Sequence, residues 1–259
     1  MALLSSIVKF LDEELKINAI QDLSLNGLQI GDLNHEVTKI AFAVDASLET
    51  FERAEGHDLL IVHHGLLWNK PIKFVEREFK RIEFLIHHNM AVYAAHLPLD
   101  YHEYYGNNTQ LAQFLDIKKP KPFVESGGAL HLFNKTREEP IGVYGKIKEQ
   151  DVNEFVKDVE KKLKTVVRAD LFGSTLVRTV GVVTGSGAYE LVHCQRLGID
   201  TFITGEPRHS MYHVAKELKL NVIYAGHYVT ETFGVKALMP VLKKKFEVEV
   251  TFVDVPTGL

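Results

Sequence analysis

The 259-residue sequence lacks several features that mark particular classes of protein. Its only cysteine, Cys194, cannot form a disulfide within the chain, which suits a reducing compartment, so we expect a cytoplasmic protein. The N-terminus has neither the basic start nor the long apolar run of a signal peptide, and no stretch is apolar enough to span a membrane. A net charge of −4 gives no electrostatic reason to expect nucleic acid as a partner.

The remaining composition is that of a globular protein. Hydrophobic residues make up 46% of the chain and charged residues 25%, which allows a sizeable core beneath a charged surface. The length corresponds to one large domain or to two ordinary ones.

Strands and helices are expected to alternate along the chain. The strands are expected at 38–45, 58–62, 91–95, 178–184, 200–204, 221–225 and 247–253. Ser47 should cap the helix that follows the first strand. Apolar spacing predicts two further helices. One carries Val75, Phe79, Ile82 and Ile86 at helical spacing, and the other has Leu111, Phe114 and Leu115 facing inward. This alternation predicts an α/β fold in which helices cover a mixed sheet.

Two segments of the chain are alike, which suggests an internal duplication. Residues 90–96 read MAVYAAH and residues 221–227 read NVIYAGH, and each histidine is followed four residues later by a carboxylate. We predict two similar, intertwined α/β repeats, 1–123 and 124–259, with C-terminal elements able to pack back on the first. The segment 117–128, rich in lysine, proline and glycine, is the expected linker. The alternative is that two buried strands rich in alanine and valine look alike by chance.

Polar side chains with metal-binding chemistry follow three of the predicted strands. His63 and His64 end the strand after Asp58, and Gly65 follows them. The other two strand ends carry His96 with Asp100, and His227 with Glu231. Because parallel strands place ligand sites beyond their carboxyl ends, we expect these groups to converge on a metal site.

The number and type of these ligands favour two ions rather than one. Adjacent residues of a strand point to opposite faces, so His63 and His64 should contact different ions. Asp100 and Glu231 are the candidates to bridge them. Imidazole and carboxylate ligands suit Zn, Mn, Fe, Co or Ni and do not choose among these metals. The alternative is that each histidine near a strand end is an ordinary hydrogen-bonded residue.

Three further positions are weaker candidates for a site. Gly185-Ser186-Gly187 lies between a strand and a helix, where it could bind phosphate or form a plain tight turn. Glu206, at the end of a strand, could face a substrate or lie beside the metal ligands. Trp68 could form a wall of the pocket or cover the core.

Several motifs taken together resemble one known family. They are His-His-Gly at 63–65, His-x-x-x-Asp at 96–100, Thr-Gly-Glu at 204–206, Gly-His-Tyr-x-Thr-Glu at 226–231 and Asn-Gly-Leu-Gln-Ile-Gly at 26–31. The combination is similar to the GTP cyclohydrolase 1 type 2 homologues, also called Nif-three-like proteins. The resemblance covers nearly the whole chain, although Leu25 stands where many members have aspartate.

The resemblance implies a fold, an assembly and a ligand set. It implies a duplicated, intertwined α/β fold and a toroidal homohexamer whose metal sites face an internal cavity. One ion would be held by His64, Asp100 and Glu231, and the other by His63, His227 and Glu231. His96 matches a position beside the metals, where it is our candidate for a proton shuttle.

These observations leave more than one function open. The first hypothesis is a metal-dependent hydrolase of a nucleotide or related heterocycle. If the family's cyclohydrolase name describes the reaction, hydroxide would attack C8 of guanine in GTP and formate would leave. The second is a ring-shaped, metal-binding scaffold or regulator without enzymatic activity. The third is a phosphoester hydrolase, which phosphate binding at 185–187 would favour.

Overall fold

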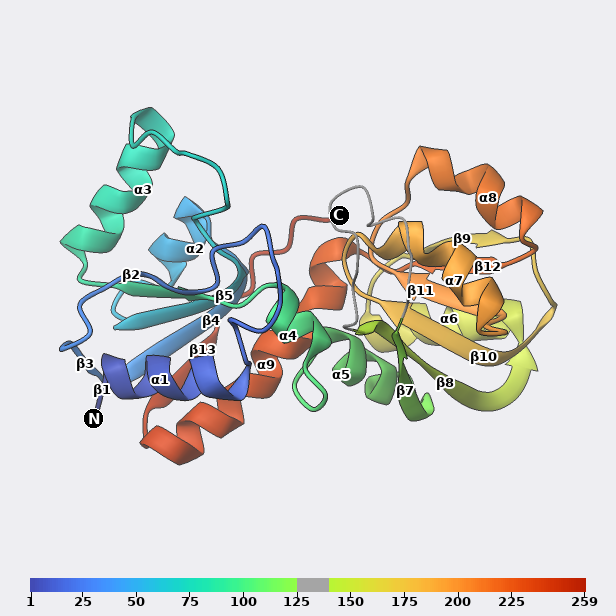
Figure 1. Ribbon diagram of the computed structural model, residues 1–259, viewed down its shortest axis with the longest axis horizontal. Coiled ribbons are helices and arrows are strands. Elements are labelled where there is room, and N and C mark those ends of the chain that lie inside the picture. The colour runs from blue at the N-terminus through green and yellow to red at the C-terminus, as the bar shows by residue number, and fades with distance from the viewer. Residues whose placement is uncertain (125–139) are drawn as a thin grey trace. The chain divides into compact units, whose positions relative to one another are not determined.

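The computed structural model describes residues 1–124 and 140–259, which divide into two compact units. The first unit comprises residues 1–105 and 234–255, and the second comprises residues 106–233 and 256–259. Each unit is a mixed sheet covered by helices, as the sequence predicted (Figure 1). Among the described residues, no helix has both the length and the apolar character that a membrane crossing requires.

The first unit is built on a five-stranded sheet in the order β13-β4-β5-β6-β2. Strands β13, β4, β5 and β6 are parallel, and β2 runs antiparallel to β6. Its elements are β1 (Ala2–Leu3), α1 (Leu4–Glu14), β2 (Gly27–Ile30), β3 (Glu36–Val37), β4 (Lys39–Asp45), α2 (Leu48–Arg53), β5 (Leu59–His64), α3 (Glu76–His87), β6 (Ala91–Ala94), α4 (Leu97–Tyr101) and β13 (Glu249–Phe252).

The second unit is built on a six-stranded sheet in the order β7-β8-β10-β11-β12-β9. Strands β10, β11 and β12 are parallel, and the other strands pair antiparallel. Its elements are α5 (Asn107–Phe114), β7 (Lys118–Val124), β8 (Pro140–Asp151), α6 (Val152–Leu163), β9 (Arg168–Leu171), β10 (Leu176–Val183), η2 (Gly187–Glu190), α7 (Leu191–Arg196), β11 (Thr201–Thr204), η3 (His209–Met211), α8 (Tyr212–Glu217) and β12 (Asn221–Tyr224). Helix α9 (His227–Phe246) begins in this unit and ends in the first.

The two sheets share one topology. The order β4-β5-β6 with antiparallel β2 in the first unit matches β10-β11-β12 with antiparallel β9 in the second. An aspartate before the middle strand has the same role in both, because Asp58 accepts the amides of Thr38 and Lys39 while Asp200 accepts those of Arg178 and Thr179. The chain therefore contains two similar α/β repeats, intertwined because β13 returns to pair with β4.

The strand register corrects the alignment suggested by the two similar segments. Tyr93 pairs with Ile61 and packs in the core cluster beneath α1, whereas Tyr224 pairs with Thr204 and packs in the cluster beneath α7 and α8. Since Ile61 corresponds to Ile203, which pairs with Ile223, the match is offset by one residue. The duplication is carried by the topology rather than by MAVYAAH and NVIYAGH.

The units differ from the predicted repeats at their boundaries. Strand β7 occupies part of the expected linker 117–128 and pairs antiparallel with β8, at the edge of the sheet, where proline residues are tolerated. Leu111 and Ile117 pack in the second unit's core, so α5 and β7 belong to that unit rather than to the first repeat. Residues 125–139 of the linker and hairpin region lie outside the described part of the chain.

Helix α3 forms where the apolar spacing predicted a helix, but most of that apolar row is exposed. Val75, Phe79 and Ile86 are 58%, 52% and 67% exposed, whereas Leu85 is buried. The inward face also carries Arg81, which pairs with Glu78 and stacks over Phe51. In α5, Leu111 is buried as predicted but Phe114 is 45% exposed. The N-cap prediction for α2 is confirmed, because the Ser47 hydroxyl accepts the Thr50 amide.

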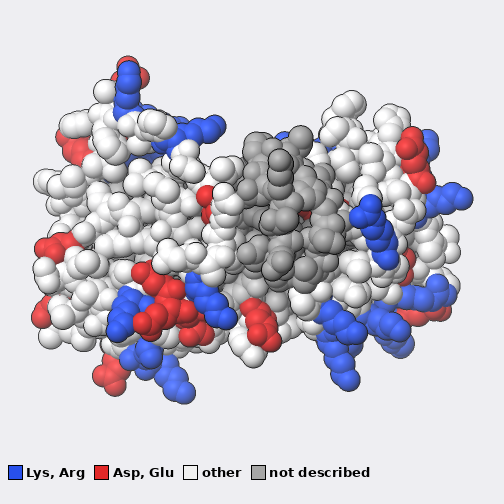
Figure 2. All heavy atoms as spheres, viewed as in Figure 1, with Lys and Arg blue, Asp and Glu red and all other residues white. Residues whose placement is uncertain are grey.

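Charge on the molecule is mixed in sign. On the face shown in Figure 2, Lys and Arg side chains and Asp and Glu side chains both occur on each unit. This distribution accords with the small net charge of −4.

Candidate metal centre

Three histidines meet at one edge of the first unit's sheet. His63 and His64 are the last residues of β5, and His96 follows β6, the parallel neighbour of β5. One ring nitrogen from each of the three lies within 4.8 Å of those of the others, a spacing that a metal ion can bridge. We call His63, His64 and His96 the histidine cluster. Their convergence follows from the parallel pairing, which brings the carboxyl ends of both strands to the same edge.

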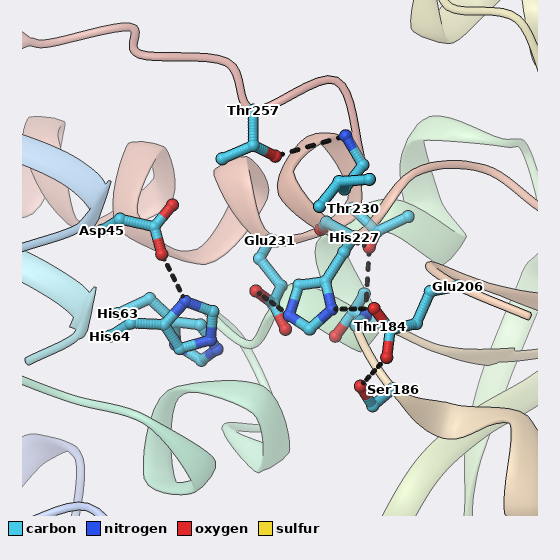
Figure 3. Close-up of polar contacts among 12 residues, drawn as sticks. Asp45, His63, His64, Thr184, Ser186, Glu206, His227, Thr230, Glu231 and Thr257 are labelled. Carbon is cyan, nitrogen blue, oxygen red and sulfur yellow. Dashed lines mark hydrogen bonds and ion pairs between the residues drawn. The ribbon is translucent and has the colours of Figure 1, made fainter. Parts of the chain in front are cut away.

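An oxygen acceptor holds the Nδ1 atom of each histidine in this cluster. His63 Nδ1 contacts the Ala95 carbonyl at 2.9 Å. His64 Nδ1 contacts Asp45 at 2.8 Å (Figure 3). His96 Nδ1 contacts Asp22 at 2.9 Å. Histidines that bind metals characteristically donate a hydrogen bond from their second ring nitrogen in this way. That bond fixes the orientation of the ring and leaves Nε2 as the ligand.

Asp100 adds a carboxylate beside the cluster. It lies in the short helix α4, which begins directly after His96 and contains Pro98 in its first turn. Its Oδ2 atom is 3.5 Å from His63 Nε2, and the residue is buried. The first unit therefore supplies imidazole nitrogen and carboxylate oxygen in one place.

The sequence interpretation missed Asp45 and Asp22, whose carboxylates orient two of these rings. Asp45 is the last residue of β4 and pairs directly with His64 across the parallel ladder. A strand-end aspartate beside the strand that carries the histidines was a signal available in the sequence. Asp22 lies outside any helix or strand, so only the folded chain reveals its role.

Trp68 borders the histidine cluster. Its indole nitrogen donates to the Gly65 carbonyl at 3.1 Å, and its ring centroid is 5.1 Å from that of His96. The side chain is 36% exposed, so part of the ring faces solvent.

The second unit contributes a histidine and carboxylates at the start of α9. His227 is the first residue of α9, and Glu231 lies one turn later with its Oε2 atom 3.1 Å from His227 Nε2. Glu206, which follows β11, accepts from His227 Nδ1 at 3.2 Å and from the Ser186 hydroxyl at 2.6 Å (Figure 3). His227 is thus oriented by a carboxylate in the same manner as His64 and His96.

This arrangement shifts the acidity of the groups around His227. Burial lowers the pKa of His227, but hydrogen bonding and charge interactions with Glu231, and then with Glu206, outweigh it and raise the pKa to about 9. Burial likewise raises the pKa of Glu206, but hydrogen bonds from Ser186 and His227 outweigh it and lower the pKa. In the metal-free protein His227 is therefore a cation between two carboxylates at neutral pH.

Two glycines allow the backbone to pass close to His227 and Glu231. A Cβ atom on Gly185 would lie 2.1 Å from Glu231 Oε1, and one on Gly205 would lie 2.7 Å from the Cα atom of His227. Gly185 also has a φ of +61°, which favours glycine. Gly185 needs glycine because the chain passes against the Glu231 side chain, and Gly205 needs it because the chain passes against the backbone of Gly185 and His227.

The segment 185–187 is used for support rather than as an open anion cradle. The amide of Gly185 donates to the Thr230 hydroxyl at 3.1 Å, and that of Gly187 donates to the Thr204 hydroxyl at 3.0 Å. The Ser186 hydroxyl donates to Glu206. The segment is a tight turn that holds Glu206 and α9, which argues against the phosphate-binding interpretation.

The side chains of both units fit a divalent metal. They are imidazole nitrogens and carboxylate oxygens, and each of the four histidines has its Nδ1 engaged by an oxygen acceptor. Such donors suit Zn, Mn, Fe, Co and Ni alike.

Comparison with known proteins identifies the family. Residues 2–258 match the family model described as Duf34/NIF3 (NGG1p interacting factor 3). The chain belongs to the Duf34/NIF3 family. The resemblance drawn from the motifs at the ends of the strands is therefore confirmed.

Relatives of similar length extend this assignment. The proteins named GTP cyclohydrolase 1 type 2 homolog from Archaeoglobus fulgidus and Pyrococcus horikoshii are 41% and 43% identical to the chain. The first match covers 99% of both chains and the second covers 98% of both. Among solved structures, TTHA1606 from Thermus thermophilus matches with a TM-score of 0.87 and 37% identity, and protein ybgI with 0.89 and 30%, each over 100% of both chains. The fold of this chain is thus shared by both of these solved structures over their full length.

Replacing Gly185 with alanine should weaken metal binding. The added Cβ would overlap Glu231 and displace its carboxylate from His227. Loss of correct orientation around metal ligands typically costs about 10–100-fold in affinity, and we expect a loss of that size in chelator competition with zinc. Gly198→Ala is the matched control, because its φ of +66° is similar and a Cβ there meets nothing within 4 Å. Equal affinity losses in both variants would show that backbone strain alone is responsible.

The His227 imidazole of metal-free protein should titrate near pH 9 rather than near histidine's ordinary 6.5. Because the folded-state pKa is raised, the stability contributed by the charged ring is complete below pH 6.5 and is lost as the pH rises through 9. At neutral pH, metal must displace this proton, so affinity should rise with pH. NMR of labelled histidines measures the midpoint, which Glu206→Gln should lower. A wild-type midpoint close to 6.5 would contradict the assignment.

Proposed function

We propose that this chain is a dinuclear metal-dependent hydrolase that acts on a nucleotide or a related heterocycle. One observation carries the proposal, namely that four imidazoles are each held through Nδ1 by an oxygen acceptor, in two groups that each contain a carboxylate. Rings held in this way present Nε2 as a metal ligand.

The proposed ligands divide between two ions. His64, Asp100 and Glu231 would hold one, and His63, His227 and Glu231 would hold the other, with Glu231 as the bridge. The assignment follows from the family resemblance. Five ligand side chains exceed the three that a single catalytic ion typically needs, which favours a pair.

Residues beside the proposed metal ligands would have roles in proton transfer and substrate binding. When bound, divalent ions lower the pKa of water and so supply a nucleophile near neutral pH. His96, whose Nδ1 is held by Asp22, would move protons through its other nitrogen. Trp68, partly exposed beside His64 and His96, offers an aromatic face that a planar heterocycle could stack against.

The curated relatives' shared name points to GTP as the first substrate to test. Attack of water on C8 of guanine would open the imidazole ring and release formate. A ring-shaped, metal-binding scaffold without activity is the alternative, and the same experiment distinguishes it.

Glu231→Gln should abolish formate release and reduce bound metal from two ions per chain. The neutral amide cannot replace a bridging carboxylate between two cations. Formate is measured after incubating zinc- or manganese-loaded protein with GTP and with a panel of nucleotides, and metal is measured by elemental analysis. Glu217→Gln is the control, because Glu217 is an exposed carboxylate at the end of α8.

Two outcomes would contradict the proposal in different ways. A wild-type protein that holds two ions but releases nothing from GTP or the nucleotide panel would favour the scaffold. A protein that stays metal-free when offered zinc or manganese would remove the dinuclear centre itself.

We further propose that the chain assembles as a toroidal homohexamer, as the family resemblance implies. Apolar side chains left exposed around the start of α3 support a contact with a second copy; they are Ile72, Phe74, Val75 and Phe79. Exposed apolar groups this close in sequence would lose contact with water in an assembly.

Light scattering should give a native mass six times the 29.3 kDa of the chain. Replacing both Phe74 and Phe79 with serine should lower that mass, because it removes two large apolar side chains from the proposed contact. A monomeric wild-type protein would contradict the hexamer, and an unchanged mass in the double variant would place the contact elsewhere.

A further inference from the structure

The segment 22–29, between α1 and the end of β2, contacts both loops that carry the histidine cluster. We infer that this segment positions the cluster, and that Asp22 fixes the orientation and tautomer of His96. The inference rests on the proposed metal centre and not on the proposed reaction. Asp22 and Asn26 then have the role of positioning residues rather than catalytic ones.

Asp22 is a buried carboxylate with several donors. Its side chain is 3% exposed, and it accepts from His96 Nδ1 at 2.9 Å and from the Leu97 amide at 2.9 Å. The Asn26 side-chain amide at 2.9 Å and the Ser24 backbone amide at 3.0 Å also donate to it. Burial raises the pKa of Asp22, but the hydrogen bonds from His96, Asn26 and Ser24 outweigh it and lower the pKa, so the carboxylate is ionised.

Asn26 binds the backbone of His96. Its Oδ1 atom accepts the His96 amide at 2.7 Å, while its Nδ2 atom donates to Asp22. The ring and the main chain of His96 are therefore fixed by two neighbouring residues of one segment. This explains why an asparagine opens the motif at 26–31.

Gln29 holds the loop that follows His64. Its Oε1 atom accepts the amides of Leu66 at 2.6 Å and Leu67 at 3.1 Å, and its Nε2 atom donates to the Leu67 carbonyl at 3.2 Å. A Cβ atom on Gly65 would lie 2.5 Å from this side chain, so the glycine makes room for it. One segment thus sets the exit of β5 through Gln29 and the exit of β6 through Asp22 and Asn26.

The chemical consequence concerns the protons of His96. Asp22 already accepts three N–H donors besides the ring, so it accepts from His96 Nδ1 as well, and a neutral His96 ring then has its hydrogen on Nδ1 and its lone pair on Nε2. The centroid of the His96 ring is 5.0 Å from that of His63 and 5.5 Å from that of His64, so the ring packs against both histidines. A neutral amide in place of Asp22 could donate as well as accept, which would permit the opposite tautomer.

The ¹⁵N resonances of labelled histidine, assigned with a His96→Gln variant, report this tautomer in metal-free protein. We expect the Nδ1–H form in the wild type. In Asp22→Asn the ratio of tautomers should shift by about tenfold or more toward Nε2–H, because charge-assisted hydrogen bonds are roughly twice as strong as neutral ones. Asp32→Asn is the control, since Asp32 is exposed and, among the described residues, its carboxylate accepts only from Asn34.

A purely structural role for Asp22 gives a different result. It would lower the melting temperature of Asp22→Asn without changing the His96 tautomer, and that outcome overturns the inference. If the variant does not fold, the His96 tautomer of the wild-type protein tests the inference. A wild-type His96 ring in the Nε2–H form is incompatible with the role assigned to Asp22. Neither result depends on whether GTP is hydrolysed, so failure here is distinguishable from failure of the proposed function.

Discussion

The hydrogen bond from an imidazole Nδ1 to a fixed oxygen is the interaction on which the rest of the site depends. At the candidate metal centre it occurs at His63, His64, His96 and His227, with the Ala95 carbonyl and the carboxylates of Asp45, Asp22 and Glu206 as acceptors. Each bond selects one tautomer and one ring orientation, so the second nitrogen is available in a defined direction. The acceptors themselves are held by strand pairing or by further hydrogen bonds, and the geometry of the site therefore derives from the sheets together with the segment 22–29.

The two repeats have the same topology but carry different residues at the end of their middle strand. At the end of the middle parallel strand, His63 and His64 are the last residues of β5 in the first repeat, whereas Gly205 and Glu206 directly follow β11 in the second. The first repeat thus supplies imidazoles there, while the second supplies a carboxylate that orients His227 and a glycine that lets the backbone pass beside it. Divergence at these two positions changes the chemistry without changing the fold, because both lie where a strand ends and its loop begins.

Much of the fold was predictable because local signals agreed with tertiary packing. The strand cores, the Ser47 cap and the inward face of α6 are encoded by apolar periodicity and capping chemistry. The failures have specific causes. In α3 helical spacing of apolar residues did not report burial, because Phe79 and Ile86 are exposed while Arg81 pairs with Glu78. In β7 an edge strand tolerates the prolines that suggested a linker. The one-residue offset between the two similar segments is set by the ladder, which sequence similarity does not report.

The sequence alone determined which residue types stand at the strand ends, and with them the family and the character of the ligands. His63, His64, His96 and Asp100 could be selected because a strand followed by imidazoles is a local pattern. Only the tertiary structure decided which oxygen holds each ring. Asp22 reaches His96 across 74 residues and Glu206 reaches His227 across 21, and such pairings exist only once the strands are in register. Ligand identity is a property of the chain, whereas ligand orientation is a property of the fold.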